Sequence, residues 1–350
     1  MIQTMTDDVL NLFEISGLDA LRCPYYLLEV TNLPNDDQLT DRVRRLAAAV
    51  ATASRRPFYA YTDGVKHYLA STDAPSSLAL PAEWSSGSET AILNPRQDCH
   101  ELDYGRLDAE QAGLALDILD ARIRATLSGD PRLWRDSVNA FNEKAPAAGA
   151  SREGVGTHLR FGFRLHLLDG RVYLSVSPTL RYMSRESLEQ RLAASGSWEE
   201  LKEAGYVYKF GHRWYEARFP EPVGNSIAEQ TFPHGPSGTR HTVYDYTLRS
   251  CPEPRPDYIR QLDPRSPAIR YSSVLGGQEA FGAAALCFES FTEADEAARG
   301  GAAGSGIGQR ASMSLLLAGK YFRKVRLGAG HHLSVSGPVG EDGRAVLFRR

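Results

Sequence analysis

The chain has 350 residues, of which 42% are hydrophobic and 24% charged, a composition typical of a globular protein with a sizeable core and two or three domains. It contains no run of about 18 apolar residues, and its start lacks the basic and apolar stretches of a signal peptide. We therefore expect a cytoplasmic protein without a membrane segment. The cysteines Cys23, Cys99, Cys251 and Cys287 are widely spaced, which indicates reduced thiols.

The net charge of −3 is unevenly distributed along the chain. Residues 1–150 sum to −8 and residues 221–300 to −4, whereas residues 151–220 sum to +3 and residues 301–350 to +6. Two basic segments of this kind could build a surface that contacts phosphates. A mild asymmetry is also common on solvated surfaces, so charge alone leaves both interpretations open.

The first part of the chain predicts mixed helices and strands. Residues 9–31 indicate a strand, interrupted at Gly17 and Pro24, and residues 58–70 indicate a hairpin that turns at Asp63-Gly64. Two amphipathic helices are expected. The first covers residues 37–54 through Leu39, Val43, Leu46 and Val50, and the second follows Asp108 and ends at Gly129. A short helix is expected over residues 132–141, and the fold class is α+β.

The most informative stretch runs from Leu159 to Ala194. Two strands flank Asp169-Gly170, a strong signal for a tight hairpin turn. Pro178 should end the second strand because it has no N–H to donate. Ser184 should then cap a helix that carries Leu188 and Leu192 on its apolar face.

Residues 206–219 alternate aromatic and basic side chains, which favours a second hairpin that turns near Gly211. Basic residues between aromatic ones can hold a nucleic-acid backbone while the rings stack on bases. Aromatic residues that alternate on a strand are more often ordinary core, and that alternative stays open. The repeated Pro and Gly of residues 220–239 predict irregular structure.

Three motifs, in this order along the chain, resemble prokaryotic Argonaute proteins. Asn11-Leu12-Phe13 and the strand 25–30 resemble the start of the Argonaute N domain. The central hairpin and the following Ser-x-x-Ser-Leu pattern resemble the first linker region. Thr242-Val243-Tyr244-Asp245-Tyr246 resembles the element that opens the second linker, with Thr247 where the family usually has Phe.

The resemblance departs from a full Argonaute in two ways. Too few residues separate the first-linker unit from Thr242 to hold a PAZ domain, and the chain ends at Arg350, where an Argonaute would continue into its MID and PIWI domains. What remains resembles the APAZ region that accompanies short prokaryotic Argonautes. The resemblance implies an N-like domain over 1–144, a first-linker-like hairpin–helix unit over 152–205, a PAZ-remnant or irregular segment over 206–238, and a second-linker-like region with a basic tail over 239–350.

Enzyme and cofactor motifs are not recognisable in the sequence. Gly304-Ser305-Gly306-Ile307-Gly308 has the glycines of a phosphate loop but no following Lys-Ser/Thr, so it predicts a flexible hinge. His331-His332 should point to opposite faces of a strand, which disfavours a metal site. We therefore expect a non-enzymatic protein without catalytic residues, metal ligands or cofactor.

The leading hypothesis is that the chain is a subunit that pairs with a short Argonaute MID–PIWI protein. The pair would hold a guide RNA with its DNA target and serve prokaryotic defence. A separate effector protein is a possible further partner. The protein would recognise the backbone and the shape of the duplex, because base pairing between guide and target carries the sequence information. Chosen by charge and position, the candidate contact residues are Arg160, Arg164, Arg181, Arg185, Lys209, Arg213, Arg270, Lys320, Arg323, Lys324 and Arg326.

Two other hypotheses stay open. The chain could be the N-terminal half of a split or truncated long Argonaute, or an APAZ region separated from its effector domain. It could also be an α+β scaffold without any nucleic-acid role. Neither the chemistry of guide and target nor the stoichiometry follows from the sequence.

Overall fold

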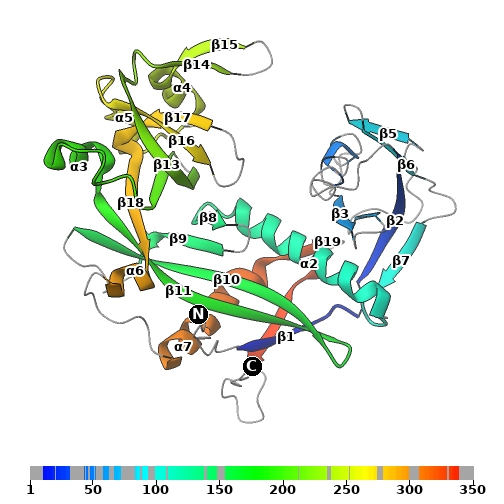
Figure 1. The fold of residues 1–350 in the computed structure, drawn as a ribbon. Helices are drawn as coiled ribbons and strands as arrows, with labels where there is room; N and C mark the ends of the chain where they lie inside the picture. Colours follow the sequence, from blue (N-terminus) through cyan, green and yellow to red (C-terminus); the bar gives the residue numbers. More distant parts are fainter. Residues whose placement is uncertain are drawn as a thin grey trace, which may run out of the picture. The chain divides into compact units, whose positions relative to one another are not determined.

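The computed structural model describes residues 11–338 apart from 20, 32–42, 44, 46–47, 51, 53–57, 63–66, 72–82, 87–88, 94–98, 108, 138–139, 148–153, 212, 235–237, 252, 274–278, 299–306 and 329–330. These residues form two compact units, each built from several stretches of the chain (Figure 1). Unit 1 comprises residues 1–127, 164–176 and 311–350, and unit 2 comprises residues 128–163 and 177–310. Both contain helices and antiparallel strands, so the expected mixture of helix and sheet is confirmed.

Unit 1 contains a six-stranded sheet organised around the long strand β2 (Arg22–Thr31). Its strand order is β3 (Tyr59–Thr62), β4 (His67–Ala70), β2, β6 (Glu89–Leu93) and β5 (Glu83–Ser86), with β7 (Cys99–Asp103) also paired to β2. The predicted hairpin over 58–70 is confirmed by the pairing of Thr62 with His67, although its turn lies outside the described residues. Pro24 does not interrupt β2, where it pairs with Glu101.

Two helices of unit 1 follow the sequence pattern. Within the helix expected over 37–54, the described residues Val43, Arg45, 48–50 and 52 are helical, and Val43 and Val50 are buried. The helix α2 (Ala109–Gly129) ends where Gly129-Asp130-Pro131 predicted, and it buries Ala115, Leu119, Ile123 and Leu127 at spacings of four residues. Its expected cap, Asp108, lies outside the described residues.

The C-terminal part of unit 1 packs beside β1 (Leu12–Ser16), which pairs with β21 (Ser334–Pro338). The predicted helix around Met313 is α7 (Ile307–Tyr321), followed by the 3₁₀ turn η2 (Phe322–Lys324) and the short strands β19 (Arg326–Gly328) and β20 (His331–His332). The apolar side of this segment is buried through Leu317, Tyr321, Phe322 and Val325.

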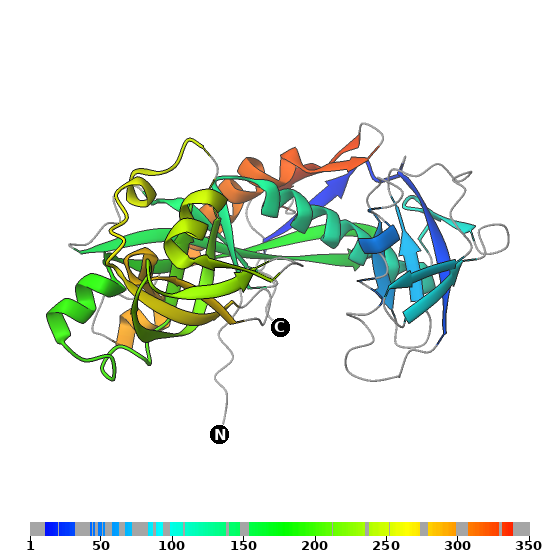
Figure 2. The same cartoon turned by 90° about the horizontal axis from the view of Figure 1, so that it is seen from above.

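The central hairpin is formed by β10 (Val155–Leu168) and β11 (Arg171–Ser187), a long twisted ribbon whose tip belongs to unit 1 and whose base belongs to unit 2 (Figures 1 and 2). The predicted turn is confirmed, because Asp169 and Gly170 have φ angles of 50° and 74°. The prediction that Pro178 ends the second strand is wrong. Among the described strands, β1 pairs with residues 173–175 of β11 and β18 with residues 181–187, so Pro178 lies between the two ladders.

The helix after this hairpin begins three residues later than expected. Its cap is Ser187 rather than Ser184, because β11 continues to Ser187. The Ser187 hydroxyl accepts from the backbone N–H of Gln190, and the Gln190 side chain accepts from the Ser187 N–H, a capping box. The resulting helix α3 (Leu188–Ser195) ends at Gly196, and Leu188 is fully buried.

Unit 2 is organised around a sheet of antiparallel strands. Its strand order is β17 (Glu279–Ala283), β16 (Pro267–Ser273), β13 (Arg213–Ser226), β12 (Tyr206–Phe210), β18 (Cys287–Thr292), β11, β10, β9 (Ala140–Pro146) and β8 (Leu133–Ser137). The helix expected over 132–141 is therefore wrong, since this segment forms β8 and the start of β9. The expected hairpin at Gly211 is confirmed by the pairing of Phe210 with Arg213.

The region between β13 and β18 completes unit 2. The prediction of irregular structure over residues 220–239 is also wrong. The strand β13 runs to Ser226, and β14 (Thr231–His234) pairs with β15 (Thr239–Thr242). Three short helices follow around β16 and β17, namely α4 (Val243–Ser250), α5 (Asp257–Arg260) and the 3₁₀ turn η1 (Ala284–Leu286), and α6 (Glu293–Ala298) follows β18.

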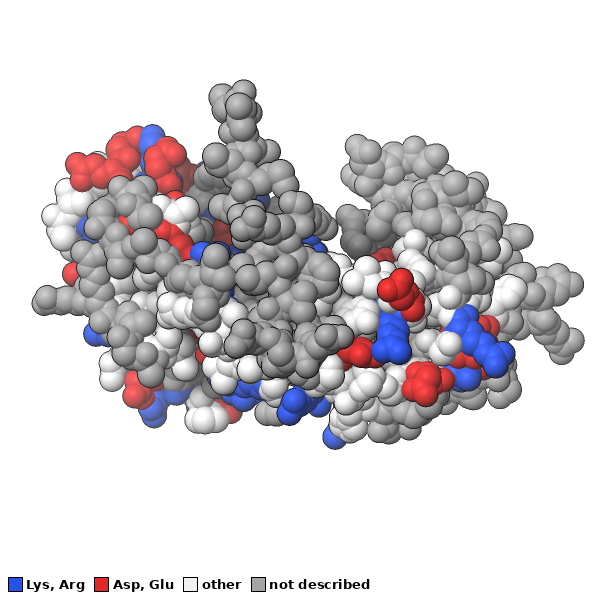
Figure 3. Space-filling view, turned by 90° about the horizontal axis from the view of Figure 1, so that it is seen from below, with Lys and Arg blue, Asp and Glu red and all other residues white. Residues whose placement is uncertain are grey.

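Charged side chains of both signs are interleaved on the surface. On the face drawn in Figure 3, Lys and Arg side chains of the described residues lie beside Asp and Glu side chains. Many surface cations are paired in this way, for example Arg22 with Asp103 at 2.8 Å. None of the helices in the described ranges is both long and apolar enough to cross a membrane.

Candidate functional site

Unit 2 contains a pocket of about 560 Å³ lined mainly by aromatic rings, a volume within the roughly 300–1,000 Å³ of small-molecule sites. Its walls come from β12, β13, β14, α4, β16 and β17, elements that are far apart in the sequence. The lining residues are Tyr208, Phe210, Tyr215, Phe232, Pro233, His234, Tyr246, Thr247, Tyr271, Glu279, Ala280 and Phe281.

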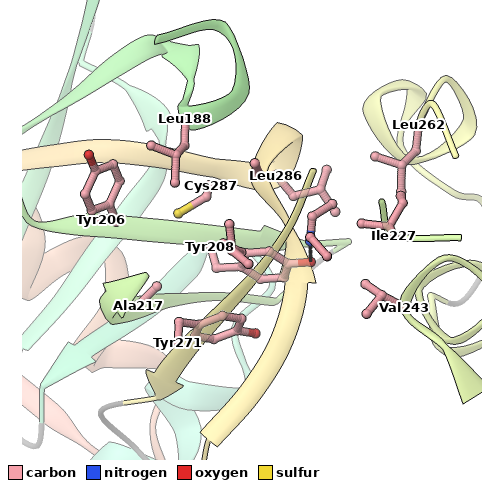
Figure 4. Close-up of a cluster of buried hydrophobic side chains, with 14 of the residues drawn as sticks. Leu188, Tyr206, Tyr208, Ala217, Ile227, Val243, Leu262, Tyr271, Leu286 and Cys287 are labelled. Carbon is pink, nitrogen blue, oxygen red and sulfur yellow. Dashed lines mark hydrogen bonds between the residues drawn. The ribbon is translucent and has the colours of Figure 1, made fainter. Parts of the chain in front are cut away.

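The floor of the pocket is a stack of three tyrosines on neighbouring strands, two of which, Tyr208 and Tyr271, are shown in Figure 4. The Tyr208 and Tyr271 rings lie 5.0 Å apart at 26°, and Tyr215 lies 5.7 Å from Tyr208. The backbone N–H of Ala283 donates to the Tyr208 hydroxyl at 3.1 Å. Tyr208 and Tyr271 are only 2% and 4% exposed, so these two rings belong to the main core of unit 2.

Burial keeps the tyrosine hydroxyls of the floor protonated. Desolvation raises the pKa of Tyr215 to about 12, and it raises the pKa values of Tyr208 and Tyr271 well above the ordinary value of 10.0. At neutral pH the floor therefore carries no negative charge and presents flat apolar faces with neutral hydroxyl groups.

The upper wall is built by the β14–β15 hairpin and α4. Thr242 caps α4 by accepting from the Asp245 N–H at 3.0 Å, which fixes the start of the helix and the direction of Tyr246. The Tyr246 ring meets Phe232 edge-on at 5.2 Å and His234 at 4.8 Å, and it stacks on Phe210 at 6.1 Å. The wall is therefore a set of mutually supported rings.

The pocket is suited to a flat and uncharged ligand. None of its described lining residues is Lys or Arg, and its one carboxylate, Glu279, is exposed together with Pro233 and His234. A ligand phosphate would meet the Glu279 carboxylate at the rim, and the cation beside it, Arg270 at 4.0 Å, is already paired with Glu221. A ring with neutral hydrogen-bonding edges could instead stack on the partly exposed rings of Phe232, Tyr246 and Phe281.

Lys209 lies on the opposite side of β12 from Tyr208 and Phe210. Its Nζ is 3.9 Å from the Phe288 ring centre and 4.6 Å from that of Trp214, a cation held between two rings. Desolvation lowers the pKa of this ammonium to about 8. Lys209 is therefore largely engaged inside unit 2.

Two further candidate cations form a buried ion pair with one carboxylate. Arg160 Nε and Arg181 Nη1 both donate to Asp136 Oδ2 at 2.8 Å. Arg181 also donates to Ser290 Oγ at 2.7 Å, and it is 7% exposed. Arg181 is used for internal structure, so we withdraw it from the candidate phosphate contacts. Arg160, with 31% of its side chain exposed, keeps a partly accessible guanidinium.

The other candidates of unit 2 lie on its surface. Arg185 and Arg213 are exposed, and neither has an ion-pair partner among the described residues. Arg270 is exposed as well, but it is paired with Glu221 at 2.7 Å and lies 4.0 Å from Glu279. Its charge is therefore largely balanced by carboxylates.

The remaining candidates belong to unit 1. Arg164 is exposed on β10, Lys320 closes α7 and lies over the Tyr321 ring at 5.2 Å, and Arg323 and Arg326 are exposed in η2 and β19. The side chain of Lys324 lies outside the described residues. The four tail cations thus occupy a helix end, a turn and a strand, rather than one helix or one strand as the sequence left open.

The pocket was not predicted from the sequence. Tyr208, Phe210 and Tyr215 lie in the aromatic segment that was singled out, but Phe232 and His234 lie in the segment expected to be irregular. Residues 231–234 pair with residues 239–242 as a hairpin, but neither segment alternates apolar and polar residues, so the local pattern gave no signal for it. In the described part of the chain, no group of three His, Cys, Asp or Glu side chains could hold a metal ion.

No protein-family model and no curated protein matches this sequence. Its structure is similar to that of Clostridium butyricum Argonaute bound to a guide DNA and a 19-mer target DNA, with a TM-score of 0.47 and 12% identity, over 84% of this chain and 38% of that one. Drosophila Piwi is similar with a TM-score of 0.47 and 13% identity, over 89% of this chain and 39% of that one.

A third similar structure is Marinitoga piezophila Argonaute in complex with a 5′ OH guide RNA and target DNA, with a TM-score of 0.36 and 13% identity. That match covers 83% of this chain and 34% of the other. The chain thus spans between 34% and 39% of the length of these three proteins.

Proposed function

We propose that this chain is a non-catalytic nucleic-acid-binding subunit and that its aromatic pocket holds an unpaired nucleoside at the end of a strand. The observation that carries the proposal is the pocket itself, with its stacked tyrosine floor and ring-lined wall. Stacking of bases on aromatic side chains is the common device of proteins that bind single strands, and each stacked base contributes about 1–3 kcal/mol.

The charge of the pocket indicates whether it binds a nucleic-acid end that carries a phosphate or one that carries a hydroxyl. With Glu279 at the rim and no cation among the described lining residues, a terminal phosphate is disfavoured and a terminal hydroxyl is accepted. Backbone phosphates farther along the strand would be contacted outside the pocket by exposed cations such as Arg213 and Arg185.

The proposed partners come from the sequence resemblance. The three Argonaute-like motifs imply an APAZ-like subunit that pairs in the cytoplasm with a short Argonaute MID–PIWI protein, holds a guide RNA and its DNA target, and serves defence against invading DNA. The third motif, Thr242 to Tyr246, has a structural role that fits its position, since Thr242 caps the helix that carries Tyr246 into the pocket wall. The alternative is the N-terminal half of a split long Argonaute, or an APAZ region separated from an effector, and sequencing the adjacent genes discriminates these.

Fluorescence anisotropy with single-stranded RNA and DNA oligonucleotides tests the pocket. Each oligonucleotide is used with a hydroxyl or a phosphate at each end. Phe232→Ala and Tyr246→Ala should each weaken binding of the hydroxyl-ended strand by about tenfold, since about 1.4 kcal/mol corresponds to one decade in affinity. Tyr182→Ala, which removes a ring stacked on Phe291 outside the pocket, is the matched control and should leave affinity unchanged. Equal affinity of all four proteins would refute the proposal.

A further inference from the structure

Phe219 is exposed in a way that the fold of unit 2 does not require. It is 79% exposed, more than Leu168, Leu315 and Leu316, the other exposed large hydrophobic residues of the described chain, and it is the only aromatic residue among the four. Its backbone has a φ of 48°, in the left-handed region that bulky side chains rarely adopt. One residue thus combines an unfavourable backbone conformation with an unburied ring.

A β-bulge produces this conformation. Arg218 pairs with Ser272 and Glu221 pairs with Arg270, so Phe219 and Pro220 together oppose the single residue Tyr271. Pro220 is buried, whereas Phe219 is directed to solvent. Bulges of this kind redirect a side chain from the regular course of a strand, and strained residues that persist are associated with functional sites.

The bulge lies beside the aromatic pocket. Tyr271, which the bulge opposes across the strand pair, is part of the pocket floor and stacks on Tyr208. Phe219 itself does not line the pocket. We infer that Phe219 is a second stacking platform, which holds the base of the nucleotide next to the one in the pocket. This inference rests on the proposed nucleic-acid binding and extends it from one nucleotide to two.

The charges around Phe219 favour a strand over a protein partner with an acidic or apolar surface. Arg218, the adjacent residue, is exposed and makes no direct ion pair among the described residues, and its charge acts on the half-buried carboxylate of Glu216. The nearby carboxylate of Glu221 is paired with Arg270 at 2.7 Å and therefore repels a phosphate less. A ring with an adjacent exposed guanidinium is the combination that can stack on a base and contact its backbone.

Oligonucleotides that carry 2-aminopurine test the inference, because the fluorescence of this base is quenched when it stacks. The full chain is mixed with single-stranded RNA and DNA in which the probe occupies either the terminal position or the next one, at each end in turn. We expect quenching at both positions. Phe219→Leu, which keeps apolar area but loses the ring, should restore fluorescence at the second position, leave the terminal signal unchanged and weaken strand binding by about five- to tenfold.

Two further variants separate stacking from a structural role. Phe219→Gly removes the left-handed strain, so it should raise the melting temperature by about 1–4 °C while weakening strand binding as Phe219→Leu does. An abasic second position in the oligonucleotide should abolish the difference between unchanged protein and both variants. Loss of affinity for an isolated nucleoside in either variant would contradict the inference, since that ligand occupies the pocket alone.

The outcomes also distinguish this inference from the proposed function. If Tyr246→Ala weakens oligonucleotide binding and the Phe219 variants do not, the stacking role of Phe219 is refuted and the proposed function of the pocket is supported. If the unchanged protein binds none of the oligonucleotides, both fail. If the Phe219 variants bind strands normally but lose a copurifying protein, Phe219 belongs to a protein interface and the platform is again refuted.

Discussion

Lys209 shows how a side chain chosen for its charge can be engaged inside the fold. Its ammonium lies between the Trp214 and Phe288 rings, and burial lowers its pKa to about 8. The cation–π contacts favour the charged form, but desolvation outweighs them, since it is the cause of the lowered pKa. A phosphate contact by Lys209 would require it to leave this position.

The pH dependence of stability should report this environment. Because the pKa of Lys209 is lower in the folded chain than the ordinary 10.5, the unfolded chain binds more protons between pH 8 and 10.5, and the contribution of Lys209 to stability rises with pH over that range. Relative to Lys209→Met, the unchanged protein should gain about 1–3 kcal/mol between pH 7.5 and 10 in urea unfolding. Lys202→Met, at an exposed lysine paired with Glu199, should show no such gain. A flat difference for Lys209→Met would contradict the assignment.

Asp136 should be among the most sensitive polar residues of unit 2. Its side chain is 1% exposed and accepts from both Arg160 and Arg181. Asp136→Asn removes the only carboxylate of the described residues to which the buried Arg181 guanidinium is seen to donate, and the half-buried Glu216 is left as its counter-charge, so we expect a loss of about 3–5 kcal/mol in the free energy of unfolding. The control is Glu221→Gln in the exposed pair with Arg270, which should cost less than about 1 kcal/mol. Similar effects in chemical unfolding would argue against the buried pair.

At the scale of elements, the hairpin β10–β11 and helix α3 show which local signals were sufficient. Asp169-Gly170 specified the turn because only a few residue types accept positive φ at both positions. Ser184 and Ser187 both fitted a helix cap, and the choice between them depended on where β11 ends. That end is set by pairing with β18, a strand about a hundred residues away in the sequence, which no local pattern reveals.

The cap assignment is testable by substitution. Ser187→Ala removes the hydroxyl that accepts from the Gln190 N–H, so it should lower the free energy of unfolding by about 1 kcal/mol. Ser184→Ala should cost clearly less, because the Ser184 hydroxyl accepts only from the exposed Glu186 N–H. Thermal unfolding of the two variants decides between them, and a larger effect at Ser184 would contradict the observed helix start.

The missed elements share one physical cause. In residues 133–136, Leu133, Trp134 and Asp136 are all buried, so the segment lacks the alternation that identifies a half-exposed strand. The pocket was missed for a related reason. Its rings come from six elements, and only their tertiary arrangement brings Phe232 and Tyr246 onto the tyrosines of β12, β13 and β16.

At the scale of the whole molecule, the candidate phosphate contacts divide between the two units. Exposed cations remain in unit 2 at Arg185 and Arg213 and in unit 1 at Arg164, Arg323 and Arg326. Within residues 301–350, five of the eight cations lie between Arg310 and Arg326, in a segment whose apolar side chains are buried and in which Arg323 and Arg326 are exposed.

Replacing Lys320, Arg323, Lys324 and Arg326 together by Ala should act through charge. Each lost phosphate contact should weaken binding of a guide–target duplex and reduce the slope of log affinity against log salt by about one, without changing sequence preference. If the cluster instead docks on the MID–PIWI partner, size-exclusion chromatography will show a broken complex before nucleic acid is added. An intact complex with unchanged duplex affinity and salt slope would show that these four residues neither contact phosphates nor dock on the partner.

Purified protein should show no turnover of nucleic acid, NAD or nucleoside triphosphates. The expectation rests on the missing catalytic motifs of the sequence. Activity that copurifies with the protein through several columns and disappears on one point substitution would overturn it.

Photo-crosslinking tests the central claim most directly. The full chain, alone and with its MID–PIWI partner, is irradiated with single-stranded oligonucleotides that carry 4-thiouridine or 4-thiothymidine at the terminal position, and the linked peptides are identified by mass spectrometry. We predict crosslinks in residues 206–215, 231–246 and 271–281, three stretches that contain eleven of the twelve lining residues of the pocket, and their loss in Tyr246→Ala. Binding without crosslinks in these three segments, or with crosslinks confined to other parts of the chain, would contradict the account.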